Sequence, residues 1–289
     1  MYVLPPPGVD VIGLEQSTVS RFEDTLPDIA RRYGLGYEEI LAANPGADPW
    51  LPGDGLQIVL PTRHVLPENL RQDVVINLPE HRLYYFPKPR DGQPAYVITH
   101  PISIGQMDWN TPLGVTTIVA KRKKPTWYPP ESIRKQHAAQ GDPLPKAVPP
   151  GPDNPLGDYA MRLGIPGGAY LIHGTNRPVG VGMRVTHGCI RMYPEDIESL
   201  YSLVPVGTRV TILNQRLKTG WIDGVLYLEV HPPLPAEPPT TLTELTRKLV
   251  DATREQSVRI NWPAAERALS EAQGMPVAVS LPQISAANR

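Results

Sequence analysis

The residues best suited to chemistry gather around Cys189, the only cysteine of the 289-residue chain. It lies in the run RVTHGCIRMYPEDI, between His187-Gly188 and Ile190-Arg191. A thiolate is a strong nucleophile, but a free thiol is only a few per cent ionised near pH 7, so a nucleophilic cysteine needs activation. Nearby histidines and a helix expected to begin near Pro194 both favour the thiolate. We therefore expect Cys189 to be an activated nucleophile.

Of the two histidines near this cysteine, His173 is the better candidate for the base. Side chains two residues apart in an extended segment point to the same side but diverge, so His187 is poorly placed to take the thiol proton. His173 ends the strand-like run AYLIHG, and a glycine-rich connection leads on to a second strand near residues 183–186. We expect a hairpin-like arrangement that brings His173 opposite Cys189, while His187 shapes the pocket through hydrogen bonds.

Two other chemistries fit this cluster less well. A zinc site of His173, His187 and Cys189 would match the ligands of catalytic zinc, but no acidic residue follows either histidine as in HxE or HExxH sites. In papain-like hydrolases the cysteine precedes its histidine, whereas here His173 comes first. We therefore expect no metal and no organic cofactor.

Composition restricts the class of protein. The net charge of −1 gives no field that would draw the chain to nucleic acid or an anionic membrane, and 40% hydrophobic residues suffice for packed cores. No apolar run approaches the ~20 residues of a transmembrane helix. The N-terminal run MYVLPPPGVDVIG lacks the basic and apolar regions of a signal peptide. The chain contains 36 prolines, which predict many loops and few long helices.

The elements that must position the cluster are mostly strands, in a region that we delimit as residues 72–214. Strand-like runs are VVINLPEHRLYYFP, AYVITHPISIG, GVTTIVAKRKK, YAMRLG and TRVTIL, and PEDIESLYSLV is a short helix with Pro194 in its first turn. The proline-rich insertion 125–155 is too long and too polar for a core element, so we expect a lid or binding loop.

Two smaller parts flank this region. Residues 1–15 are expected to be an irregular arm, and residues 16–64 a βααβ unit: a strand VSRF, a helix with Thr25 as N-cap and Asp28 completing a capping box, a helix ending at Asn44, and a final strand in LPGDGLQIVLP. After the catalytic region, residues 215–289 predict a hairpin with Asp223-Gly224 as its turn, then helices near 242–254 and 263–273.

The βααβ unit resembles the LysM module, which binds glycan containing N-acetylglucosamine. The matching residues are Asp24-Thr25-Leu26, Ile29-Ala30, Tyr33, Ile40, Asn44-Pro45 and LPGDGLQIVLP. The resemblance implies a peptidoglycan-binding module.

The run HGTNRPVGVGMRVTHGCIRM closely resembles the signature of the L,D-transpeptidase (YkuD-type) catalytic domain: a histidine, a gap, then Ser/Thr-His-Gly-Cys-hydrophobic-Arg/Asn. The resemblance extends through IGQMDWNTPLG, GPDNPLGDYAMRL and PVGTRV. The layout is similar to that of the enterobacterial periplasmic enzymes, including those that anchor Braun lipoprotein to peptidoglycan. The fold it implies is α+β and multidomain: a small βααβ LysM-like module, a mainly β, sandwich- or barrel-like catalytic domain, and a C-terminal hairpin with helices.

The resemblance implies a reaction. Cys189 would attack the bond between meso-diaminopimelate and D-Ala of a tetrapeptide stem, release D-Ala and form a thioester. An amine of another diaminopimelate or of a lipoprotein's C-terminal lysine would then take the acyl group. His173 would transfer the protons, the carbonyl of Gly174 would orient its ring, and the backbone N–H groups of Gly188 and Cys189 would hold the oxyanion.

Several further residues are expected to bind the substrate. Arg191 could hold a stem-peptide carboxylate bidentately. Thr186 belongs to the signature, and Trp127, Tyr128, Asn154 and Tyr159 are expected to line the groove for the donor peptide. The family implies a periplasmic location and a role in wall biosynthesis and cell shape, with stem peptides, glycan and a lysine-terminated outer-membrane lipoprotein as partners. The alternative is a non-enzymatic envelope protein that binds peptidoglycan through the LysM-like unit.

Overall fold

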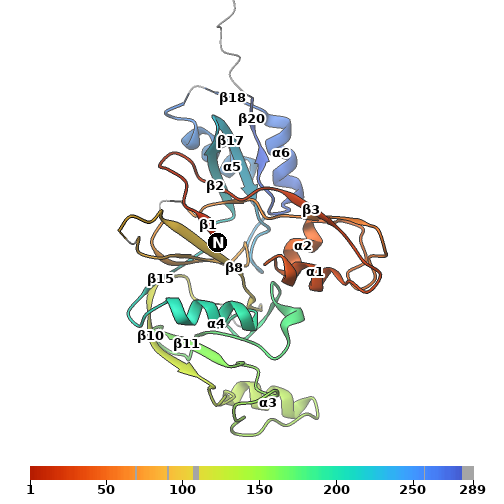
Figure 1. The fold of residues 1–289 in the computed structure, drawn as a ribbon, viewed down its shortest axis with the longest axis vertical. Helices are drawn as coiled ribbons and strands as arrows, with labels where there is room; N and C mark the ends of the chain where they lie inside the picture. The colour runs from red at the N-terminus through yellow and green to blue at the C-terminus, as the bar shows by residue number, and fades with distance from the viewer. Residues whose placement is uncertain (69, 90, 107–110, 257, 282–289) are drawn as a thin grey trace, which may run out of the picture. The chain divides into compact units, whose positions relative to one another are not determined.

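The computed structural model describes residues 1–68, 70–89, 91–106, 111–256 and 258–281 (Figure 1). The chain forms two compact units, Met1–His100 with Thr211–Arg289, and Pro101–Val210. The boundary between the two units falls inside residues 72–214, the region that we expect to be catalytic. The helices of the described residues are all too short or too polar to cross a membrane.

The small module has the predicted βααβ order. Strand β3 (Gln16–Val19) pairs antiparallel with β4 (Gln57–Leu60), and α1 (Leu26–Arg32) and α2 (Tyr37–Ala43) lie between them in sequence. Thr25 and Asp28 form the predicted capping box. The predicted strand at residues 19–22 is wrong: β3 ends at Val19, because the Ser20 hydroxyl donates a hydrogen bond to the loop carbonyl of Gly53 (2.6 Å).

Residues 1–15 are not an irregular arm. Strand β1 (Tyr2–Val3) pairs with β8 (Tyr96–Pro101), and β2 (Val11–Ile12) pairs with β5 (His64–Val65). The Val11-Ile12 pair is buried, and Ile12 joins a core cluster with Leu66 and Val75. Burial of these apolar side chains explains why the segment is ordered.

Strands β6 (Asp73–Asn77) and β7 (Arg82–Phe86) form a hairpin within the predicted strand-like run VVINLPEHRLYYFP, and β8 and β1 extend it in the order β1-β8-β7-β6. The buried guanidinium of Arg82 lies 2.7 Å from Glu39 of α2. This ion pair joins the small module to β7 within the same unit.

The tail also follows its prediction. Strands β16 (Leu217–Ile222) and β17 (Val225–Val230) form a hairpin, and both turn residues, Asp223 and Gly224, have positive φ, as a type I′ turn requires. Helices α5 (Leu242–Ala252) and α6 (Trp262–Glu271) pack on this hairpin through a shared apolar core. The short strands β18 (Arg259–Ile260), β19 (Val277–Ala278) and β20 (Ser280–Leu281) complete the unit.

In the second unit, four strands run in the order β10-β11-β12-β14. They are β10 (Gly114–Lys123), β11 (Tyr159–Leu163), β12 (Leu171–His173) and β14 (Ile190–Arg191). Helix α4 (Pro194–Leu203), with Pro194 in its first turn as predicted, packs against β11 and buries Ile197 and Leu200 (Figure 1). Strand β13 (Arg184–Thr186) pairs with β9 (Ile104–Gly105), a 3₁₀ turn covers Pro178–Gly180, and β15 (Arg209–Leu213) crosses the boundary between the units.

Candidate active site

Strands β12 and β14 bring the candidate catalytic residues together. They pair in parallel, with Ile172 opposite Ile190 and His173 opposite Arg191. The isoleucines are fully buried on one face, so His173 and Arg191 project from the other, and Cys189, two residues before Arg191, lies on that same side. The predicted hairpin is wrong in detail: the chain crosses over through β13, so His173 lies beside Arg191 and is a diagonal neighbour of Cys189.

The imidazole of His173 is buried and anchored. Its Nδ1 lies 2.6 Å from the carbonyl oxygen of Gly174, a contact in which Nδ1–H donates. Burial and the nearby Arg191 guanidinium lower the pKa of His173 to about 3, although the bond to Gly174 acts in the opposite direction. The ring is therefore neutral at pH 7, and its Nε2 is left as the proton acceptor.

Cys189 is half-buried, and its thiol lies 3.7 Å from the carbonyl oxygen of Ala169. Burial raises the pKa of the Cys189 thiol, and the backbone of Leu171 and the charge of Arg191 only partly oppose this effect. The expectation that the surroundings favour a thiolate is thus wrong in direction. Desolvation penalises the anion more than the neighbouring groups stabilise it, so the resting pair is a neutral thiol and a neutral imidazole.

The loop that carries the cysteine is held by hydrogen bonds to its carbonyl groups. The Thr186 hydroxyl donates to the carbonyl of Cys189 (2.6 Å), and the Thr111 hydroxyl donates to that of Gly188 (3.1 Å). Gly188 has φ of +91°, which favours glycine. Within the part of the chain that the structure describes, the amides of Gly188 and Cys189 donate no hydrogen bond. They are therefore available to a substrate oxygen.

Thr111 is a residue that we did not single out from the sequence, although it lies in the quoted run IGQMDWNTPLG. Four other residues of that run, 107–110, lie outside the described part of the chain. Thr111 is buried, and its contact with Gly188 links this run directly to the cysteine loop.

The guanidinium of Arg191 faces the same side of the strands as His173. It is half-buried, and its buried Nε has no hydrogen-bond acceptor among the described residues. No carboxylate of the described residues forms an ion pair with it. A half-buried guanidinium that has no carboxylate partner in this part of the chain can attract an anionic group of a substrate.

The insertion 125–155 contains a helix that the sequence analysis missed, α3 (Glu131–Ala139). The sequence signal for this helix was a proline pair, Pro129-Pro130, directly before Glu131 and Lys135, which are spaced i,i+4 and form an ion pair. Trp127 is half-buried, and its backbone pairs with Val148 at the base of the insertion. Tyr128 is exposed.

Helix α3 reaches the cysteine loop through Gln136. Gln136 places its Oε1 3.4 Å from Nε2 of His187. Burial, with the neighbouring His137 and Arg191, lowers the pKa of His187. His187 is expected to form hydrogen bonds that shape the pocket, and its imidazole meets Gln136 of the insertion.

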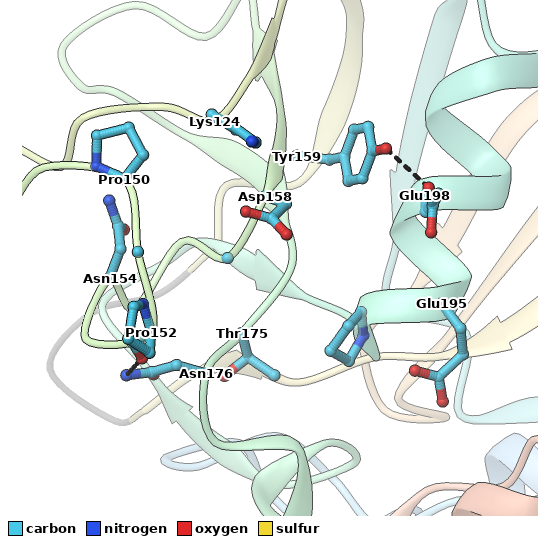
Figure 2. Close-up of a pocket in the computed structure, with 13 residues that line it drawn as sticks. Lys124, Pro150, Pro152, Asn154, Asp158, Tyr159, Thr175, Asn176, Glu195 and Glu198 are labelled. Atoms are coloured by element: carbon cyan, nitrogen blue, oxygen red, sulfur yellow. Dashed lines mark hydrogen bonds between the residues drawn. The ribbon is translucent and has the colours of Figure 1, made fainter.

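Tyr159 and Asn154 line a different pocket, whose walls do not include Cys189 or His173 (Figure 2). The buried Asn154 amide donates to the carbonyl of Pro125 (2.8 Å) and accepts from the amide of Leu156 (2.9 Å), so it holds the insertion in place. The Tyr159 hydroxyl donates to Glu198 of α4 (2.8 Å). The residues expected to bind the donor peptide are thus divided between two places.

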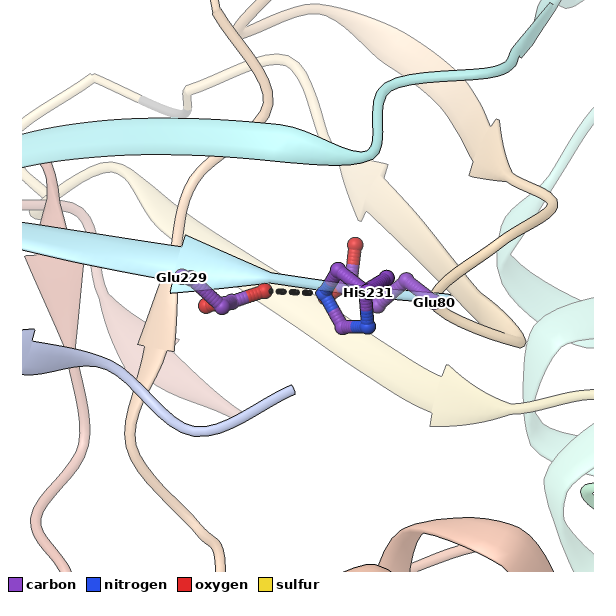
Figure 3. A group of neighbouring side chains, drawn as sticks. All are labelled: Glu80, Glu229 and His231. Atoms are coloured by element: carbon purple, nitrogen blue, oxygen red, sulfur yellow. Dashed lines mark hydrogen bonds and ion pairs between the residues drawn. The ribbon is translucent and has the colours of Figure 1, made fainter. Parts of the chain in front are cut away.

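One group of side chains in the described residues has the spacing of metal ligands: Glu80, Glu229 and His231, in the unit that contains the tail (Figure 3). The ammonium of Lys218 lies between them, 2.8 Å from Glu80 and 2.5 Å from Glu229. His231 lies 2.7 Å from Glu229. Lys218 already supplies a cation at this point, so the group is a buried ion network with no room reserved for a metal.

Comparison with known proteins gives two matched families. The L,D-transpeptidase catalytic domain (YkuD) matches residues 71–212, and the LysM domain matches residues 21–49. The chain is 39% identical to "Probable L,D-transpeptidase YcfS" of Escherichia coli (strain K12), over 98% of this chain and 89% of that protein. It is 40% identical to "Probable L,D-transpeptidase ErfK/SrfK" of the same strain, over 96% and 90%. Among solved structures, an L,D-transpeptidase from Mycobacterium smegmatis is 22% identical over 55% of this chain and 63% of that one, with a TM-score of 0.34.

Proposed function

The chain belongs to the L,D-transpeptidase family, and we propose that it cleaves the meso-diaminopimelate–D-Ala bond of peptidoglycan tetrapeptide stems through a thioester on Cys189. The observations that support this mechanism are the anchored, neutral His173 and the strand register that places it on the face of β12 and β14 bearing Arg191 and, two residues before it, Cys189. In the resting structure the thiol itself contacts the carbonyl of Ala169. A neutral pair favours general-base catalysis, in which the proton leaves as the new bond forms.

In the first step, the sulfur of Cys189 attacks the carbonyl carbon of diaminopimelate while Nε2 of His173 takes the thiol proton. The carbonyl oxygen gains negative charge, and the amides of Gly188 and Cys189 are the available donors for it. The tetrahedral intermediate then collapses, His173 returns the proton to the leaving amine, and D-Ala departs with a thioester left on the enzyme.

In the second step, an amine attacks the thioester carbonyl. His173 takes the amine proton and returns it to sulfur, so the thiol is regenerated and a new amide bond forms. The acceptor is the amine of another diaminopimelate or of a lipoprotein's C-terminal lysine. Arg191 binds a carboxylate of the stem peptide, which suits a half-buried guanidinium that forms no ion pair with a carboxylate of the described residues.

The LysM domain supports a location at the wall. We infer that it binds peptidoglycan glycan and that the enzyme acts in the periplasm, where stems and outer-membrane lipoproteins meet. Its Glu39 pairs with Arg82 of β7, a contact within the first unit.

Intact-protein mass spectrometry with a disaccharide tetrapeptide tests the mechanism. We expect an adduct of the tripeptide muropeptide on the wild type and none on Cys189→Ala, together with release of D-Ala. Adding a lysine-terminated peptide should remove the adduct and give a new amide. An unmodified Cys189 with no D-Ala released would instead favour a protein that only binds peptidoglycan.

A further inference from the structure

The pocket lined by Tyr159 and Asn154 has no part in the two steps above. Its volume is about 880 Å³, and it lies between the proline-rich insertion, the start of β11, the loop after β12 and the first turns of α4 (Figure 2). Every lining residue lies within the second unit. A pocket of this size can hold several residues of a peptide.

The walls of the pocket are predominantly acidic. Glu195 and Glu198 project from successive turns of α4, and Asp158 from the segment before β11, while Lys124 is the single cationic side chain of the lining (Figure 2). The hydrogen bond from Tyr159 fixes the carboxylate of Glu198. Three carboxylates stand against Lys124 in the lining and Lys123, whose ammonium lies 5.8 Å from the ring centroid of Tyr159, so the pocket keeps an excess of negative charge and attracts positive charge.

The spacing of these carboxylates argues against a metal ion. Among the described residues, only the group of Glu80, Glu229 and His231 brings its ligand atoms within 4.8 Å of one another. Asp158, Glu195 and Glu198 do not meet this spacing as a set of three, so they suit separate positive charges along an extended molecule better than one shared ion. Pro150 and Pro152 add apolar surface, against which the methylene groups of a lysine side chain can pack.

The floor of the pocket is close in sequence to the proposed base. Thr175 lines the pocket and follows His173 by two positions in the chain. Two residues of extended chain span at most ~7 Å, so the Cα atoms of Thr175 and His173 lie within that distance of each other. Gly157, also in the lining, packs against the backbone of Gly174, which holds the His173 ring. A ligand here would therefore be adjacent to the turn that orients the imidazole.

We propose that this pocket binds the basic side chains of a peptide acceptor and so selects cationic peptides for the second step. This inference rests on the proposed function, which requires an amine acceptor. Stem peptides as donors would not need the pocket, because their carboxylates suit Arg191 instead.

The test separates binding from catalysis. The probe is a fluorescein-labelled hexapeptide that contains two lysines and ends in lysine, measured by anisotropy with the full chain. Neutralising both helix carboxylates (Glu195→Gln with Glu198→Gln) should weaken binding about fivefold, as expected for two partly exposed ion pairs. It should slow transfer to this peptide by a similar factor and leave thioester formation unchanged. The matched control, Glu266→Gln with Glu271→Gln on α6, should change neither.

Two further measurements decide the outcome. Reversing one charge with Glu198→Lys should weaken binding more than neutralisation does, and raising the salt concentration should remove the difference between wild type and variants. Unchanged affinity in both pocket variants, or displacement of the peptide by an uncharged glycan fragment, would overturn the proposal. A wild type that binds the peptide through these carboxylates but forms no thioester would overturn the proposed function and leave the pocket's preference for basic peptides supported.

Discussion

Nδ1 of His173 donates a hydrogen bond to the carbonyl oxygen of the next residue, Gly174, at 2.6 Å. This contact sets the tautomer and turns Nε2 outward from the anchoring carbonyl. In hydrolase triads a carboxylate performs this task, and there it also stabilises the imidazolium. A carbonyl carries no full charge, so here it orients the ring without making the protonated form stable, in keeping with the low pKa of His173.

We expect His173→Gln to lower the rate of thioester formation by about 10²–10⁴-fold, the usual contribution of a positioned base. The amide of glutamine can replace the hydrogen bond but cannot accept the proton. The rate of D-Ala release measures the loss. His187→Gln is the control and should lose much less, since His187 contacts Gln136 of α3. Equal losses of D-Ala release in the two variants would show that His173 is not the base.

The thiol of Cys189 should react slowly with iodoacetamide at pH 7. Burial raises its pKa, so the thiolate fraction at neutral pH is below that of a free cysteine and should increase as the pH rises beyond the ordinary range of a thiol. The rate of alkylation as a function of pH, followed by mass spectrometry, gives the apparent pKa. A plateau reached below pH 7 would reveal a thiolate–imidazolium pair and contradict the neutral resting state.

Gly157 should be intolerant of a side chain. A Cβ there would lie 2.9 Å from the amide nitrogen of Thr175 and 3.2 Å from the carbonyl carbon of Gly174, and its φ is +64°. We expect Gly157→Ala to push the anchor of His173 out of place, to slow thioester formation and to lower the free energy of unfolding by about 1–3 kcal/mol.

The matched control for this substitution is Gly167→Ala. Gly167 has φ of +81°, but no atom lies within 4 Å of its added Cβ. Gly167→Ala therefore introduces the strain of a positive φ without a steric clash between the new Cβ and its neighbours. If both variants lose thioester formation equally, backbone strain rather than displacement of Gly174 would be responsible.

Local patterns were sufficient to predict most elements. The capping box at Thr25, the turn at Asp223-Gly224 and the helix at Pro194 depend on neighbouring residues alone, and all three are present. The sequence cluster of Cys189 and His173 also lies on one face of paired strands. Short-range chemistry is visible in sequence because the chain itself keeps these residues close.

What the sequence could not supply depends on contacts between distant segments. The crossover that pairs β12 with β14 in parallel is set by packing, and the burial that raises the pKa of Cys189 follows from it. Tyr159 and Asn154 could not be assigned to a separate pocket without knowing where α4 packs. The strand conformation of Val11 and Ile12 likewise depends on pairing with β5, which is distant in sequence.

The buried ion network gives the last prediction, in which Lys218→Met should destabilise its unit strongly. Lys218 and Glu229 are fully buried, and the lysine also donates to the carbonyl of Val65 (2.7 Å). Burial alone would raise the pKa of Glu229, but Lys218 and His231 lower it below its usual value. Removing the ammonium leaves a buried carboxylate without its main partner, a change that typically costs about 3–5 kcal/mol.

The control is Lys248→Met, which removes a partly exposed ion pair with Glu68 and should cost no more than about 1 kcal/mol. Calorimetry at a series of pH values measures how the difference in the free energy of unfolding between the wild type and Lys218→Met changes with pH. The stabilisation from Glu229 is present above the unfolded pKa of a glutamate and is lost as the pH falls through its lowered folded pKa. In the variant, burial is no longer opposed by Lys218 and raises the pKa of Glu229. The deficit of Lys218→Met should therefore be large at pH 7, shrink as this carboxyl takes up a proton, and shrink further as the wild type loses its own stabilisation. A deficit independent of pH would mean that lost packing, and not an uncompensated Glu229, destabilises the variant.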